Sequence, residues 1–223
     1  IRDRIYTNVD KILVTSRMFQ NYFIEEFGIS EDRIEYLPQY AISEFDNIPD
    51  QPEKNTTDFV FAGNVGAAQN LYVILKAAKS VQQEELSDNG KKIYFHIIGD
   101  GQELDNLKKY AQDNGIQNVI FHGRKPSEEM PRYYAFADAM IVTLTDNPLV
   151  SLTLPAKVQS YMAAGKPILA SANGEIANVI KESGAGFCAH ADDDSEFVDI
   201  VKLFLNNEER YNCLLYKSDA ADE

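Results

Sequence analysis

The sequence alternates short runs of β-branched and aromatic residues with longer stretches of helical periodicity, and this alternation restricts how the chain can fold. Strands that are apolar on both faces are typical of a parallel sheet covered by helices on both sides. We therefore predict an α/β fold with a doubly wound parallel sheet. The expected strands are residues 12–15, 34–37, 58–62, 93–98, 119–122, 139–143 and 167–170, and the expected helices are 17–27, 70–81, 102–114, 127–136, 156–164, 175–181 and 195–206.

The prolines of the segment before residue 58 indicate a break between two domains. We interpret 1–45 as the end of a preceding domain, 46–57 as a linker and 58–212 as a ligand-binding domain. Residues 213–223 are similar to the translation of a common sequencing adapter, and we expect them to be foreign to the protein. Because the chain also starts without Met, we expect a fragment cut at both ends.

The charge of the chain excludes some kinds of partner. Lys and Arg number 21 against 35 Asp and Glu, which gives a formal net charge of −14. Nucleic-acid binding and polybasic membrane binding both need a positive surface, so we expect neither. No apolar run approaches the ~18 residues of a transmembrane helix. Cys188 and Cys213 lack metal-ligand and disulfide-framework spacing, and we interpret His96 and His122 as core residues; we expect no metal site.

Glycine directly follows three of the expected strands, at the edge where parallel sheets bind ligands. Gly63 and Gly66 come after the strand at 58–62, and the helix behind them would point its positive end toward an anion. The loop lacks the third glycine of a dinucleotide fingerprint and the Gly-Lys-Ser/Thr of a phosphate-binding P-loop. Gly99, Asp100 and Gly101 follow the strand at 93–98, where Asp100 is expected to cap the next helix or to orient a polar ligand group.

Cations stand beside the same edge of the predicted sheet. Gly123 is followed by Arg124 and Lys125, after the strand at 119–122. Lys157 lies in the first turn of the expected helix at 156–164, where a lysine opposes the helix dipole. A ligand anion at that N-terminus would explain this lysine.

Several segments together resemble the nucleotide-sugar half of GT-B glycosyltransferases of family 4. Their order and spacing match over about residues 8–210. The closest subgroup is similar to O-antigen and capsule enzymes such as N-acetylfucosamine transferases. The matching segments read DKILVTS (10–16), FGI (27–29), IEYLP (34–38), FAGNVG (61–66), IGDG (98–101), FHG (121–123), ADA (137–139) and PAKVQSYMAAGKP (155–167).

The resemblance implies a Rossmann-like GT-B donor domain that transfers a sugar, with retention, from a UDP-linked donor and without a metal or other cofactor. It implies diphosphate contacts from the first glycine loop, base contacts near Gly123, and sugar and diphosphate contacts before and within the helix at 156–164. The expected donor-binding residues are Gly63, Asn64, Gly66, Gln69, Gly99, Asp100, Gly101, Gly123, Arg124, Leu152, Thr153, Leu154, Lys157 and Ser160.

The sequence departs from the family pattern at four positions. Asn64 and Gln69 stand where many members carry an Arg and a Lys that neutralise the diphosphate. Leu152 and Ser160 stand where the family has paired glutamates, which contact the donor sugar and the ribose. Lys157 and Arg124 then remain as the candidate cations.

The resemblance thus predicts a bacterial surface-polysaccharide glycosyltransferase, cytoplasmic or peripheral at the inner face of the membrane, with a lipid-linked glycan acceptor. Because the acceptor would bind through the missing N-terminal domain, the fragment is expected to bind donor without turnover. The sequence leaves three alternatives open: a non-catalytic sugar-nucleotide-binding subunit, a GT-B-like sugar-nucleotide 2-epimerase, and a nicotinamide oxidoreductase. Cleft histidines would favour the epimerase, and bound NAD would favour the oxidoreductase.

Overall fold

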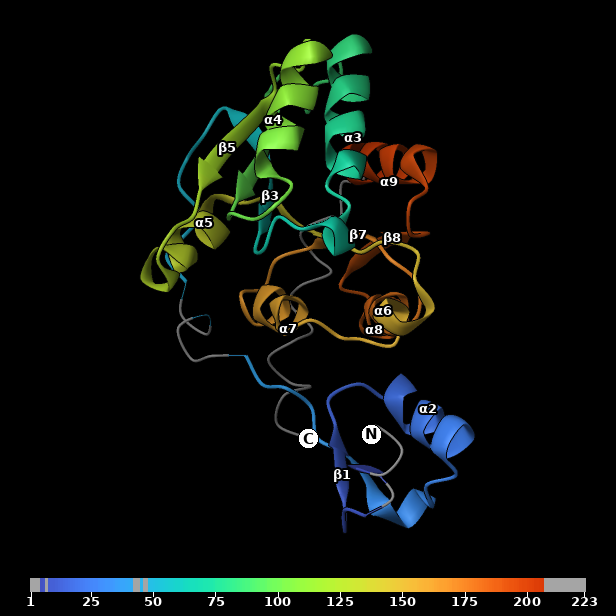
Figure 1. The fold of residues 1–223 in the computed structure, drawn as a ribbon. Coiled ribbons are helices and arrows are strands. Elements are labelled where there is room, and N and C mark those ends of the chain that lie inside the picture. Colours follow the sequence, from blue (N-terminus) through green and yellow to red (C-terminus); the bar gives the residue numbers. More distant parts are fainter. Residues whose placement is uncertain (1–4, 7, 42–44, 46–47, 207–223) are drawn as a thin grey trace.

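The computed structural model describes residues 5, 6, 8–41, 45 and 48–206, which form a six-stranded and a two-stranded sheet (Figure 1). The expectation for 213–223 lies outside the described residues. Among the described residues, no helix has the length and hydropathy that crossing a bilayer requires.

The larger sheet is parallel throughout and has the strand order β5-β4-β3-β6-β7-β8. Counted from β3, this is the order 3-2-1-4-5-6 of Rossmann folds, which confirms the predicted fold class. The direction of winding reverses between β3 and β6, and ligands bind at such a reversal. The strands are β3 (Thr56–Ala62), β4 (Lys92–Ile98), β5 (Val119–Gly123), β6 (Ala139–Thr143), β7 (Ile168–Ser171) and β8 (Gly186–Ala189).

Helices cover both faces of this sheet. Successive side chains of a strand point to opposite faces, and in the central strands both sets are apolar. Phe59 and Phe61 enter one core, and Val60 and Ala62 enter the other. The first core is closed by α3 (Tyr72–Gln83), α4 (Leu104–Asp113) and α9 (Asp194–Asn206). The second is closed by α5 (Met130–Phe136), α7 (Ala156–Ala163) and α8 (Glu175–Ser183) (Figure 1).

Residues 12–36 form a small separate unit. Parallel strands β1 (Ile12–Val14) and β2 (Ile34–Tyr36) pack with α2 (Met18–Phe27), and the 3-10 turn η1 (Glu31–Arg33) precedes β2. Its core contains Val14, Phe23 and Ile34. Figure 1 shows this unit beside α6 (Pro148–Ser151) and α8.

The structure adds elements that the sequence pattern did not predict. These are β8, α6 and the 3-10 turns η1 and η3 (Ala67–Gln69), while the helix expected at 127–136 begins as a 3-10 turn, η4 (Ser127–Glu129). β8 is built from small residues and one phenylalanine, without the β-branched residues that mark the other strands. β3 also begins at Thr56, two residues before the expected strand, so Thr56 and Thr57 belong to the sheet rather than to the linker.

A buried ionic cluster fixes the segment before β3 against the sheet. The Lys54 ammonium lies 2.7 Å from the Asp58 carboxylate and 2.5 Å from that of Asp138. His96 Nε2 lies 2.9 Å from Asp58, and His96 Nδ1 lies 2.8 Å from His122 Nε2. Burial alone would raise the pKa of Asp58, but the hydrogen bonds from His96, Lys54 and Thr56 lower it to about 2.

Candidate functional site

Backbone hydrogen bonds hold together the loops that follow β3, β4 and β5. The Gly63 N–H donates to Ile98 O, and the Gly99 N–H donates to Gly123 O, both at 2.9 Å. Further out, the Val65 N–H donates to Asp100 O at 2.9 Å. The three loops therefore form one rigid surface at the carboxyl edge of the sheet.

This surface contains a pocket of about 330 Å³. Five of the expected donor-binding residues line it together, although they come from three different loops. Lys125 and Arg124 bring two positive charges to its rim. The lining residues are Gly63, Asn64, Ile98, Gly99, Asp100, Arg124, Lys125 and Met130.

The glycines of these loops permit an approach that no side chain would allow. Gly99 has φ +144°, and a Cβ built on it would lie 1.8 Å from the carbonyl oxygen of Gly63. Gly101 has φ +157°, and its Cβ would lie 2.3 Å from Val65 O. The first and second loops are packed backbone against backbone, so glycine is required at 99 and 101.

Lys157, in the first turn of α7, extends to the first glycine loop. Its Nζ lies 4.1 Å from the centroid of the Phe61 ring, and it occupies the space that a Cβ on Gly63 would need. It makes no hydrogen bond or ion pair with any of the described residues. Burial lowers the pKa of this ammonium to about 8. An unpaired cation thus stands beside the pocket, at the N-terminus of a helix.

Gln69 and Asp100 order the glycine loops from within. Gln69 Oε1 accepts hydrogen bonds from the Gly66 N–H at 3.2 Å and from Asn64 Nδ2 at 3.3 Å. Asp100 Oδ1 accepts from the N–H of Gly101 at 2.8 Å. The expectation that Asp100 caps the next helix is wrong, because α4 begins only at Leu104 and Glu103 occupies its N-cap position.

The other expected residues lie around the start of α7, outside the pocket lining at Gly63. Leu154 is buried, and Thr153 Oγ1 donates to Val150 O at 2.6 Å. Ser160 Oγ donates to Ala156 O at 3.2 Å, so this hydroxyl is bound within its own helix. Leu152 O accepts from the hydroxyl of Ser16, a contact between the two sheet units.

Tyr161, which has no expected role from the sequence, holds the backbone directly before the first glycine loop. Its hydroxyl accepts from the Ala62 N–H at 3.2 Å and donates to Ala62 O at 3.0 Å. The side chain is fully buried, and that burial raises its pKa. Tyr161 therefore fixes the end of β3, directly before Gly63. Its spacing of four residues from Lys157 is a signal that both side chains lie on one face of α7.

His96 is a core histidine, as expected: it is buried, and its ring nitrogens contact Asp58 and His122. His122 is only half-buried and contacts His96. Burial, together with the nearby His96 and Lys125, lowers the pKa of His122. Within the described part of the chain, no three metal-binding side chains converge.

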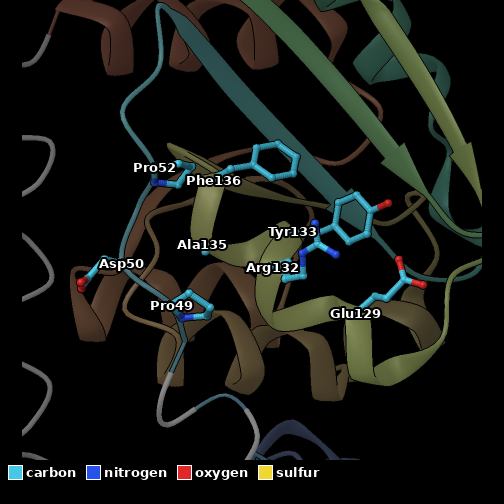
Figure 2. A pocket seen from close by; sticks show the side chains of 8 residues that line it. All are labelled: Pro49, Asp50, Pro52, Glu129, Arg132, Tyr133, Ala135 and Phe136. Atoms are coloured by element: carbon cyan, nitrogen blue, oxygen red, sulfur yellow. The ribbon is translucent and has the colours of Figure 1, made fainter.

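A second pocket, of about 400 Å³, lies between α5 and the proline segment 49–52 (Figure 2). Figure 2 shows Tyr133 and Phe136 of α5 with the prolines Pro49 and Pro52. None of the expected site residues lines it, and it shares no residue with the pocket at Gly63.

Comparisons with known proteins agree with this geometry. Residues 44–218 match the family model described as glycosyl transferases group 1. The chain is 31% identical over 196 residues to "Probable glycosyltransferase WbjE" of Pseudomonas aeruginosa. That alignment covers 82% of this chain and 46% of the relative. It is 25% identical over 169 residues to WcaI of Escherichia coli K12, whose name assigns it to colanic acid biosynthesis as a glycosyl transferase; 71% of the chain and 39% of WcaI are covered.

A solved structure shares the fold. Anabaena HepE in complex with UDP and glucose superposes with a TM-score of 0.76 at 14% identity, over 98% of this chain and 61% of that one. The chain spans less than half the length of the two curated relatives. On the match to residues 44–218 and the identity to the Pseudomonas relative, the chain belongs to the group 1 family of glycosyl transferases, and its larger sheet has the fold of the GT-B enzymes.

Proposed function

We propose that the larger sheet unit holds the donor site of a retaining family 4 glycosyltransferase of bacterial surface-polysaccharide synthesis. The proposed donor is a UDP-linked sugar, with N-acetylfucosamine as the candidate that the resemblance suggests. The proposed acceptor is a lipid-linked glycan. The observation that carries the proposal is Lys157, a cation beside the glycine loops that has no hydrogen-bonding or ionic partner among the described residues. The crystal structure of HepE, which has a similar fold, contains UDP, and this supports UDP as the nucleotide of the proposed donor.

The site suits a diphosphate for two electrostatic reasons. The N-terminus of α7 presents the positive end of the helix dipole, and its N-cap residue, Pro155, provides no side-chain cap. Lys157 adds a full charge there, and an ammonium in a partly dry site interacts with an anion more strongly than it would in water. The proposed position of the diphosphate is between α7 and the loop that starts at Gly63.

The same groups account for the proposed chemistry. When the bond between the anomeric carbon and the diphosphate oxygen breaks, negative charge develops on the leaving diphosphate. A fixed ammonium and fixed backbone dipoles stabilise that charge without having to reorganise. Arg124 and the backbone near Gly123 are proposed to hold the base. The acceptor and the remaining groups of the reaction are proposed to come from the other half of the full-length protein.

Replacing Lys157 by Met tests this role, because Met keeps an apolar chain over Phe61 and removes the charge. We expect the Kd for UDP to rise about 5- to 150-fold, since a charge-assisted contact contributes about 1–3 kcal/mol. Wild-type affinity should also fall as the pH rises through about 8, where free Lys157 loses its proton, whereas the variant should lack this dependence. Calorimetric titration measures both effects.

The control is Lys108→Met, which removes an exposed lysine from α4. It should leave the Kd unchanged. Equal UDP affinity of wild type and Lys157→Met, with both proteins folded, would contradict the assignment of Lys157.

A further inference from the structure

A single buried carboxylate joins the two sheet units. Glu175 is the first residue of α8, and only 3% of it is exposed. Its Oε1 accepts from the N–H of Arg17 at 2.8 Å, and its Oε2 accepts from the N–H of Met18 at 3.2 Å. Glu175 therefore caps α2, which belongs to the other unit. Its charge is compensated by these amides and by the positive ends of both helices.

The contact continues into the segment that leads to Lys157. Ser16, which is fully buried, donates its hydroxyl proton to Leu152 O. Gly174 has φ +67°, and a Cβ there would lie 2.1 Å from Ser151 O, so the turn before Glu175 rests on the end of α6. The contacts form a closed ring through Ser16, Leu152, Ser151, Glu175 and α2.

A second charged contact between the described residues of the two units is much weaker. The Arg17 guanidinium lies 3.6 Å from the Glu182 carboxylate, and two thirds of each side chain is exposed. Pairs of this kind contribute little, because water and salt screen them. The buried carboxylate of Glu175 is thus the stronger tie between α8 and α2.

We infer that Glu175 is a positioning residue: by capping α2 it couples the first sheet unit to the segment 151–154, and through it to the donor site. Loss of the cap should loosen α2 and 151–154 together. Conversely, a ligand that orders 151–154 should protect the first turn of α2. Only the protection of α2 by a ligand rests on the proposed function, in which that ligand is UDP.

Hydrogen exchange of the whole chain, without ligand, tests the coupling. In Glu175→Gln we expect amide exchange to become at least tenfold faster at Arg17 and Met18, and also faster at 151–154, to which the Glu175 side chain makes no hydrogen bond among the described residues. Ser16→Ala should accelerate the same two segments, and the double variant should add little to either single one, as for residues of one network. Glu182→Gln, in the same helix and with the same partner Arg17, is the matched control and should change neither segment.

Acceleration confined to Arg17 and Met18, or additive effects of the two substitutions, would overturn the inference and leave Glu175 as a local cap.

With UDP added, wild type should gain protection at residues 16–18, and Glu175→Gln should lose this gain and bind UDP about three- to tenfold more weakly. Failure of the wild type to bind UDP would count against the proposed function alone, because the exchange without ligand still decides the coupling.

Discussion

Replacing Gly99 by Ala is expected to lower the free energy of unfolding by about 3 kcal/mol or more and to abolish UDP binding. The new Cβ would lie 1.8 Å from the Gly63 carbonyl oxygen, so two backbones must separate. The φ of +144° adds strain for any residue other than glycine. Because both loops line the pocket, the separation would deform the site as well as the sheet. Chemical denaturation and UDP titration measure the two effects.

Gly115→Ala separates the clash from the backbone strain. Gly115 also has a positive φ, +63°, but no heavy atom lies within 4 Å of a Cβ built there. This variant should lose about 1 kcal/mol, the cost of the left-handed conformation alone, and should bind UDP normally. If Gly99→Ala were no more destabilised than Gly115→Ala, the close packing of the two loops would be refuted.

Replacing Asp58 by Asn is expected to lower the free energy of unfolding by about 3–5 kcal/mol at neutral pH. The substitution removes a buried negative charge and leaves the Lys54 ammonium incompletely paired. Asp58 contacts Lys54, Thr56 and His96. Its pKa in the folded protein is about 2, below the ordinary 3.8, so its ionisation stabilises the fold above about pH 4. As the pH falls to 2, the wild type should lose about 2 kcal/mol of this contribution, while the variant cannot.

The difference between wild type and Asp58→Asn should therefore narrow by about 2 kcal/mol between pH 5 and pH 2, as measured by urea denaturation. Asp113→Asn is the control, since Asp113 forms an exposed pair with Lys109 at 3.6 Å. It should change stability by less than about 0.5 kcal/mol at either pH. A gap between wild type and Asp58→Asn that stays constant with pH would refute the ionic role of Asp58.

The sequence predicted the features of the fold that local patterns determine. Apolar runs located five of the six strands of the larger sheet, and glycines after β3 and β4 located two of the loops that line the pocket. Backbone conformation and strand ends are local properties, so periodicity and glycine positions indicate them. β8 was not predicted, because Gly186–Ala189 is short and has no β-branched residue. Its strand conformation depends on pairing with β7.

Contacts between distant residues could not be predicted in this way. Tyr161 binds Ala62, Lys54 binds Asp138, and Glu175 caps α2 across the two units. Each of these polar groups is stabilised by a partner that only the folded chain brings near. Lys157 is the exception, because its place in the first turn of a helix contradicts the helix dipole and so marked it in the sequence.

The most direct test of the donor site is calorimetric titration of the chain with UDP, GDP and NAD, without added divalent cations. We expect UDP to bind at least about tenfold more tightly than GDP or NAD. We also expect Lys157→Met to weaken UDP and GDP binding by a similar factor, because the proposed contact is to the diphosphate that both nucleotides carry. No binding of UDP to the folded chain, or tighter binding of NAD, would contradict the donor-site assignment.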